Sequence, residues 1–433
     1  MNLELSLIDI YRKIPKIQNI PRKEELLDSL HKTFLVTNDL TNKIKDGFIT
    51  GLEKNAFINP LLWEYGHILF FWEHMTFKNL GINNIHTDEN VYDSFINEKI
   101  NRYNKNELFD IDKLTILFNL VYYKVREYLM KHKLNNINYY LIRLSQLHQE
   151  MHNESFIFSY QNLNVNINFF ENIQLTNNLN FKELEFIKIY NDAYFQGNNN
   201  FDFSFDNEKP AFYKVVPNFS VSKYCITNFN YLKFIRNGGY DNKDYWLNTG
   251  WEWKKKNNIN LPMYWKKDKE IFYEKVFDKY IPVRLDNPVI HISWYEAMAF
   301  CKWGNFRLPY EYEWEYLATQ FKYKRNLYRA HINYGENYRI QSTIPVSKDE
   351  NISDLNVVGL FGNCWEWCLE PLHPYDNFTI DPVYREMSYP WFGSRRICRG
   401  GSWAVPDILI NKSYRNAQDP TCRHQYIGFR VVK

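Results

Sequence analysis

The stretch NPLLWEYGHILFFWEH, residues 59–74, decides the fold of the first part of the chain. Its apolar residues recur at the three- and four-residue intervals of a helix. They are Leu61, Leu62, Tyr65, Leu69 and Trp72. Pro60 fits the first turn of such a helix. The same spacing returns over residues 114–125, and glycine is scarce from about residue 5 to 165. We therefore predict a bundle of several long helices in residues 1–165.

The texture of the sequence changes twice after this helical part. An Asn-rich stretch begins with QNLNVNINFFENIQLTNN at residue 161, and we predict a linker over 166–205. From residue 206 to 433, short aromatic and β-branched runs are broken by Gly, Pro, Asn and Asp. This pattern favours a loop-rich mixed α/β domain, with short helices at WYEAMAFCKW (294–303) and LPYEYEWEYLAT (308–319). The predicted class is thus an α+β protein of more than one domain.

Composition excludes several classes of protein. A chain of 433 residues with 45% hydrophobic residues and a net charge of +3 can form packed cores, and it carries no basic block for nucleic acid. No run approaches the roughly 18 apolar residues of a membrane span. The start, MNLELSLIDIYRKIPK, lacks the apolar core of a secretory signal, so we expect a cytoplasmic protein whose six cysteines are reduced thiols.

Two histidines lie four residues apart in LSQLHQEMHNESF. This spacing places His148 and His152 on one face of a helix, where both imidazoles can bind one metal. A pair of partly exposed histidines is the alternative. A zinc protease site is a poor match because Gln149 stands where HExxH needs its glutamate.

His67 lies in a strongly apolar helical stretch, where a buried imidazole needs a partner. A metal is one such partner, an ordinary hydrogen bond is another, and His74 is a competing candidate ligand. Three neutral imidazoles on one face of Fe(II) would leave three adjacent positions for O₂ and two substrate atoms. That arrangement suits an oxygenase that joins two substrates.

Ordered motifs along nearly the whole chain carry a family resemblance. They are LWEYGH (62–67), VYDSF (91–95), LHQEMHNES (147–155), NGGYDNKDYWLNTGWEW (237–253), MYW (263–265), HISWYEAMAFCKW (291–303), RLPYEYEWE (307–315), GLFGNCWEW (359–367), YPWFG (389–393), CRGGSW (398–403) and IGFRVV (427–432). In this order they resemble the sulfoxide synthases that make ergothioneine, ovothiol and selenoneine.

The resemblance implies a fold and a chemistry. The fold is a DinB-like four-helix bundle followed by a C-type-lectin-like domain of the formylglycine-generating-enzyme type. The implied metal is Fe(II), held by His67, His148 and His152. The implied reaction joins the sulfur of cysteine or γ-glutamylcysteine to the imidazole of a histidine betaine (hercynine), with O₂ as oxidant. The family also uses a tyrosine as proton donor, for which Tyr375 is the first candidate and Tyr384 the second.

Substrate residues follow from the same resemblance. Arg102 matches an arginine that binds a carboxylate of the sulfur donor, with Lys105 as a second cation, and Asn416 keeps the family's asparagine. Ala417 and Gln418 replace a Trp and an Asp, so the binding of a trimethylammonium group differs here. Trp403 and Trp391 are candidate aromatic walls for it.

Other functions stay open at this point. The alternatives are an ovothiol-type synthase, a non-catalytic lectin-like binding protein, and another iron oxygenase on this scaffold with an unrelated amine or thiol substrate, which the changes at Ala417 and Gln418 favour. Formylglycine formation is disfavoured, because Val405 and Ile410 occupy the positions of its two cysteines.

Overall fold

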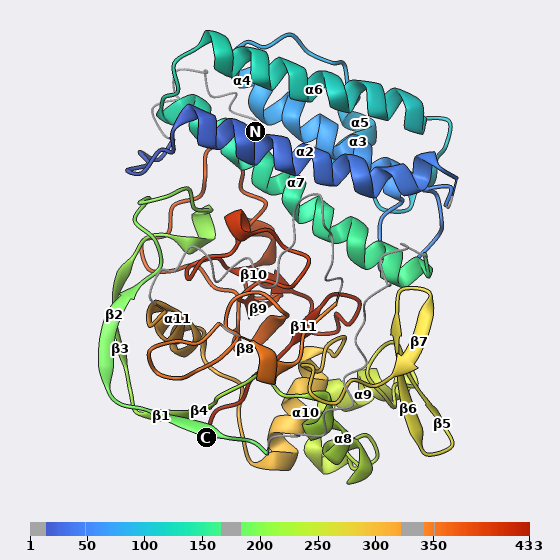
Figure 1. The fold of residues 1–433 in the computed structure, drawn as a ribbon, viewed down its shortest axis with the longest axis vertical. Coiled ribbons are helices and arrows are strands. Elements are labelled where there is room, and N and C mark those ends of the chain that lie inside the picture. Colours follow the sequence, from blue (N-terminus) through green and yellow to red (C-terminus); the bar gives the residue numbers. More distant parts are fainter. Residues whose placement is uncertain (1–13, 48, 166–182, 322–341, 350) are drawn as a thin grey trace.

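The helices of the N-terminal half form a layer above the C-terminal half (Figure 1). The computed structural model describes residues 14–47, 49–165, 183–321, 342–349 and 351–433. The long helices of the upper layer are α2 (Lys23–Lys45), α3 (Leu61–Phe71), α6 (Ile111–Lys131) and α7 (Asn136–Leu163). The short elements between them are the π-helix η1 (Trp72–Phe77), α4 (Lys78–Leu80), α5 (Glu89–Tyr92) and the 3₁₀ turn η2 (Asn101–Tyr103).

Local sequence explains where these helices begin and what they bury. Asp110 caps α6 by accepting a hydrogen bond from the Lys113 amide, and Asn135 caps α7 in the same way with the Ile137 amide. All residues of α3 are buried, as its unbroken apolar sequence requires. Among the described helices, none combines the length and apolar character that a bilayer crossing requires.

The C-terminal half contains short strands and helices, which confirms the predicted α+β class. The helices are α8 (Asn228–Arg236), α9 (Asn248–Lys256), α10 (Trp294–Gly304) and α11 (Glu311–Thr319). The strands are β1 (Phe186–Ile189), β2 (Asp192–Gln196), β3 (Phe212–Val216), β4 (Phe219–Ser222), β5 (Trp265–Asp268), β6 (Ile271–Val276), β7 (Lys279–Pro282), β8 (Trp365–Pro371), β9 (Arg396–Arg399), β10 (Asn416–Gln418) and β11 (Ile427–Gly428). The largest described sheet has the order β10-β9-β8-β11, antiparallel except for the parallel pair β8 and β11. All six cysteines are free, as expected.

Part of the predicted linker belongs to the C-terminal half. Residues 166–182 lie outside the described residues, but 183–205 contain β1 and β2. β1 pairs with β4 and β2 pairs with β3, both antiparallel (Figure 1). The difference arises because FIKI and DAYFQ each pair with a partner strand from further along the chain, which the Asn-rich composition around them hid.

Helix α7 joins the two halves. Its Glu154 carboxylate accepts hydrogen bonds from Trp365 Nε1 at 2.9 Å and Ser402 Oγ at 2.5 Å. Two turns further, Gln161 Nε2 donates to the Lys275 carbonyl at 2.9 Å. These bonds fix the helix that carries two of the candidate ligands against the C-terminal half.

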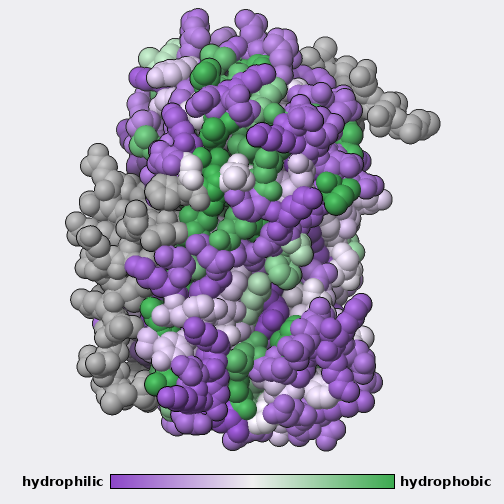
Figure 2. Space-filling view, turned by 90° about the vertical axis from the view of Figure 1, so that its right-hand side faces the viewer, coloured by the Kyte–Doolittle hydropathy of each residue, from purple (hydrophilic) through white to green (hydrophobic). Residues whose placement is uncertain are grey.

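Hydrophobic side chains form a band over the helical half of one face, while hydrophilic side chains dominate elsewhere on that face (Figure 2). Phe95, Ile96 and Ile100, between α5 and α6, are among the large apolar residues that are mostly exposed. Phe95 also lines the cavity described next. The wall of that cavity is therefore partly apolar where it meets the surface.

Candidate metal centre

Three histidines converge between the two halves of the chain. His67 comes from α3, and His148 and His152 come from successive turns of α7. One ligand atom of each lies within 4.8 Å of the others. The Nε2 atoms of His148 and His152 are 3.3 Å apart. The four-residue spacing thus places both imidazoles on one face, as predicted.

Hydrogen bonds at Nδ1 orient two of the three rings. His67 Nδ1 donates to the Tyr92 carbonyl at 2.7 Å, and His152 Nδ1 donates to the buried Glu64 carboxylate at 2.7 Å. These partners set the tautomer and leave each Nε2 with a lone pair. Gly66 makes this possible, because a Cβ there would lie 2.0 Å from the Tyr92 ring. The tight packing brings the Tyr92 carbonyl to His67.

Aromatic packing and burial keep the imidazoles of His67 and His148 neutral. Phe71 stacks on His148 with ring centroids 3.5 Å apart, and Trp63 stacks on His67 at 5.0 Å. Burial, with His152 nearby, lowers the pKa of His67 to about 3 and that of His148 well below its usual range. Neutral imidazoles are the form that binds metals.

These residues fit a metal ion. Two Nε2 atoms that face each other at 3.3 Å are close enough for both to lie about 2 Å from one metal ion. The Nδ1 atom of His148 is buried without a hydrogen-bond partner among the described residues, so its ring is not explained by hydrogen bonding alone. Three imidazoles suit Fe(II) among other first-row metals.

The three histidines line a cavity of about 390 Å³ between the halves. Other predicted site residues also line it: Arg102, Tyr384, Asn416 and Gln418. Both halves of the chain therefore contribute to one site, and its volume fits small molecules.

Arg102 is held rigidly beside the histidines. Its guanidinium carbon lies 4.0 Å above the Trp63 ring, which in turn stacks on His67. It donates to the Asn59 side chain at 3.0 Å and to the carbonyls of Asn97 and Ser94 at 3.0 and 2.8 Å. All three acceptors are neutral, so the positive charge is available for a ligand.

The structure places the two candidate tyrosines differently. Tyr384 lines the cavity and meets the rings of His148 and Phe71 edge to face, at 5.9 and 5.1 Å. Tyr375, the first candidate, packs under Arg415 at 4.1 Å and accepts a hydrogen bond from Gln196. It is buried away from the cavity lining, because the loop after β8 turns it into the core. Tyr384 takes its place as the candidate proton donor.

Lys105 does not reach the cavity either. It is exposed in the turn after η2, whereas Arg102 points inward. Among the two aromatic candidates, Trp391 lines the cavity and Trp403 lines a different, water-sized pocket beside Tyr426. Val405 and Ile410 are buried in the apolar core.

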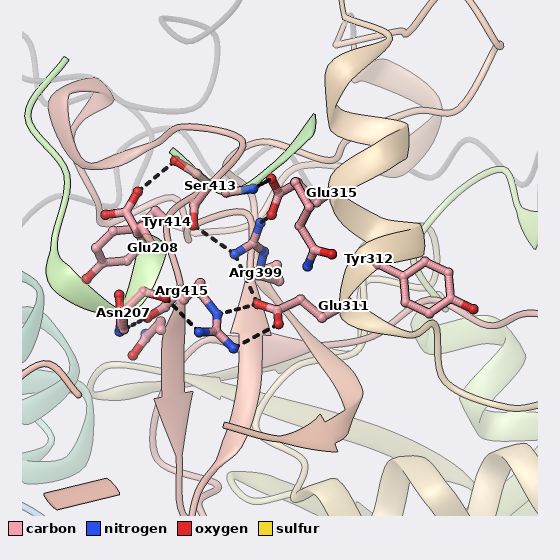
Figure 3. A network of polar contacts seen from close by, with 12 residues as sticks. Asn207, Glu208, Glu311, Tyr312, Glu315, Arg399, Ser413, Tyr414 and Arg415 are labelled. Carbon is pink, nitrogen blue, oxygen red and sulfur yellow. Dashed lines mark hydrogen bonds and ion pairs between the residues drawn. The ribbon is translucent and has the colours of Figure 1, made fainter. Parts of the chain in front are cut away.

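A buried ion-pair network positions Asn416 and Gln418 (Figure 3). Arg415, directly before Asn416, forms a two-bond pair with Glu311 of α11 at 2.7 and 2.9 Å. Arg399 of β9 pairs with Glu315 of α11 at 2.6 Å. Paired buried charges with several hydrogen bonds hold one geometry, so β10 presents its side chains to the cavity from a rigid base.

Sequence reasoning missed several residues of the site. Glu64 precedes His67 by three residues, so the helix places both on one face. That spacing could have indicated that Glu64 lies near the metal centre. Glu386, Arg395 and Gln425 line the cavity from loops or strand ends, and no local pattern marks them. Their contribution depends on tertiary contacts.

The carboxyl group of Asp206 holds the loop that carries Tyr384, and its protonation should make the stability of the protein depend on pH. Asp206 accepts hydrogen bonds from the Asp381 amide at 3.1 Å and Ser388 Oγ at 2.7 Å, on either side of Tyr384. Burial and the nearby Asp381 raise the pKa of Asp206 from 3.8 to about 6. The native state therefore binds this proton more tightly than the unfolded chain, so stability is full below about pH 4 and falls as the pH rises to about 6.

We expect the Asp206→Asn substitution to remove this pH-dependent loss of stability, while the amide oxygen still accepts the two hydrogen bonds. At pH 8 its free energy of unfolding should exceed that of the wild type by about 1–3 kcal/mol, and at pH 4 the two should agree. Urea unfolding at both pH values measures this. A wild type that gains on the variant as the pH rises would contradict the assignment.

Residues 186–433 match the family model of the sulfatase-modifying factor enzyme 1-like domain. The chain belongs to this family. The match covers the sheet β10-β9-β8-β11 and the loops that close the cavity from below. It does not include the helices that carry the three histidines.

Relatives of this member of the sulfatase-modifying-factor family include an oxygenase. It is 30% identical over 240 residues to the hercynine oxygenase of Mycobacterium tuberculosis, covering 53% of this chain and 56% of that protein. It is 27% identical over 245 residues to ergothioneine biosynthesis protein 1 of Schizosaccharomyces pombe, covering 54% and 28%. The formylglycine-generating enzyme of Streptomyces coelicolor is 30% identical over 174 residues, covering 34% and 53%.

These comparisons confirm the resemblance to the ergothioneine-type sulfoxide synthases. The chain spans little more than half the length of the hercynine oxygenase that it matches.

Proposed function

We propose that this protein is an Fe(II)- and O₂-dependent sulfoxide synthase of the ergothioneine type. It would join the sulfur of cysteine or γ-glutamylcysteine to an imidazole carbon of a histidine betaine. The observation that carries the proposal is the meeting of His67, His148 and His152 in a cavity that Arg102 and Tyr384 also line. The relatedness to hercynine oxygenase supports the substrate class.

The proposed reaction balances without a further reductant. The thiol loses its S–H hydrogen, the imidazole loses one C–H hydrogen, and a C–S bond forms. One oxygen atom of O₂ becomes the sulfoxide oxygen, and the other leaves as water with both hydrogens. Iron bound by the three histidines would supply the activation of O₂ and the oxidation of sulfur.

The chain's own residues would bind, orient and protonate. Arg102 is placed to hold the carboxylate of the thiol donor with its free N–H groups. Burial, with Glu386 and Asp206 nearby, raises the pKa of Tyr384. Its phenol therefore keeps its proton at neutral pH and can donate it inside the cavity. Apolar walls at Phe158 and Met151 would limit water around the reacting atoms.

The DinB-like identity of the helical layer, its boundary at about residue 165 and the cytoplasmic location stay predictions within this proposal. The four long helices α2, α3, α6 and α7 support the first of them.

Anaerobic loading with Fe(II), followed by air, hercynine and either thiol, tests the function. We expect O₂ uptake that requires both substrates and a product whose mass equals the two substrates plus one oxygen minus two hydrogens. Iron binding with no such product from either thiol would reject the proposed substrates.

A further inference from the structure

Arg395 lines the cavity from the C-terminal half, directly before β9, whereas Arg102 lines it from the helical half. Its guanidinium carbon lies 3.3 Å from the centroid of the Trp391 ring. Trp391 is itself fixed, because its Nε1 donates to the Glu386 carbonyl at 2.7 Å. The backbone of Arg395 is also held, since its carbonyl accepts from the Leu372 amide at 2.8 Å. The side chain is therefore presented from a rigid base.

No carboxylate neutralises this guanidinium among the described residues. Its one hydrogen bond there runs from Nη1 to the Ala417 carbonyl at 3.3 Å. The neighbouring positions on β10 are Asn416, Ala417 and Gln418, all uncharged. The charge of Asp419 acts on Arg395, but its carboxylate accepts from the Thr421 amide, and no ion pair between the two is present in the described residues.

The other acids of the cavity wall form no ion pair with Arg395 in the described residues either. Glu64 binds His152, and Glu154 binds Trp365 and Ser402. Glu386 lines the cavity too, but no ion pair joins it to Arg395 in the described part of the chain. Burial lowers the pKa of Arg395 to about 10, which leaves it charged at neutral pH and reflects the cost of a half-buried cation without a counter-ion.

We propose that Arg395 binds a substrate carboxylate, separate from the carboxylate that Arg102 binds. The site then takes two carboxylate groups, one on the helical side and one on the β9–β10 side. A planar guanidinium stacked on an indole keeps one edge free for two parallel N–H···O bonds, the geometry that carboxylates prefer. This inference rests on the proposed function for the identity of the two substrates, which both carry carboxylates.

The neighbouring Arg396 offers a matched control. It too lies over an indole, with its guanidinium carbon 4.1 Å from the Trp294 centroid, and it too donates to a carbonyl, that of Leu369 at 3.3 Å. It does not line the cavity. Arg395→Gln and Arg396→Gln therefore each remove one positive charge at adjacent positions, of which only the first lines the cavity.

Calorimetric titration of the iron-loaded protein without O₂ measures the effect. Hercynine, cysteine and γ-glutamylcysteine are titrated separately, each beside its methyl ester. We expect Arg395→Gln to raise the Kd of one substrate class about 10- to 100-fold, with the other class and the Arg396→Gln variant unchanged. The ester of the affected substrate should bind wild type and Arg395→Gln alike. The class affected identifies which substrate lies on the β9–β10 side.

Two results would overturn the proposal. The first is that the Arg395→Gln variant binds hercynine, cysteine and γ-glutamylcysteine with the same Kd as the wild type. This result would leave the proposed function intact. If the wild type binds none of these substrates, the proposed function fails instead. Arg395 is then tested by thermal shift with the twenty amino acids, at least one of which should stabilise wild type and Arg396→Gln but not Arg395→Gln. A panel with no such amino acid would also overturn it.

Discussion

Replacing His148 with alanine should remove bound iron and lower the rate of product formation by more than about 100-fold. Loss of a hydrogen-bond partner of a metal ligand already costs about 10- to 100-fold, and loss of the ligand itself should cost more. His148 faces His152 at 3.3 Å and stacks on Phe71, so alanine also leaves a gap in the cavity wall. Iron content by elemental analysis and the initial rate of product formation measure the two effects.

His74→Ala is the matched control for this prediction. His74 lies two turns after His67 in the continuing π-helix and stacks on Phe70 with centroids 5.3 Å apart. It does not line the cavity. Iron content and rate should stay near wild type in this variant. If iron is instead lost from His74→Ala and kept by His148→Ala, the ligand set is wrong.

Tyr384→Phe should lower turnover by about 100- to 10,000-fold while iron content and substrate Kd stay unchanged. The substitution keeps the ring that packs on His148 and Phe71 and removes only the phenolic proton. Because the binding groups remain, the loss should fall on kcat and leave KM nearly constant. Single-turnover measurements with both substrates bound separate the chemical step from product release.

Tyr375→Phe distinguishes catalysis from packing. Tyr375 is buried under Arg415 and accepts a hydrogen bond from Gln196 at 3.3 Å. Its loss should cost about 1 kcal/mol of stability and change kcat only a few-fold. Equal losses of kcat in the two variants would contradict the role given to Tyr384.

The candidate ligands were predictable partly from local rules and partly from the family resemblance. His148 and His152 meet because one helix repeats every 3.6 residues. His67 was preferred to His74 only through the resemblance, because an apolar helix requires a partner for a buried imidazole without saying which one. The groups that orient them were harder to predict. Tyr92 reaches His67 only because Gly66 lets its ring pack against α3, a contact that depends on two segments meeting.

Residues on loops were predicted less well than residues on helices. Tyr375 and Tyr384 lie nine residues apart in one irregular segment, and no periodicity says which of them faces inward. Asp206, which is distant in sequence, accepts hydrogen bonds from this segment on both sides of Tyr384 and so helps to fix its course. Arg395 was missed for the same reason, since its role depends on Trp391 beneath it and on uncharged neighbours across the strand pair.

The most direct test of the metal centre is a crystal structure of the iron-loaded protein with an anomalous map at the iron edge. We predict one strong peak about 2 Å from a ring nitrogen of each of His67, His148 and His152, inside the cavity that Arg102 and Tyr384 line. A peak coordinated by other residues, or no peak after loading, would contradict the account.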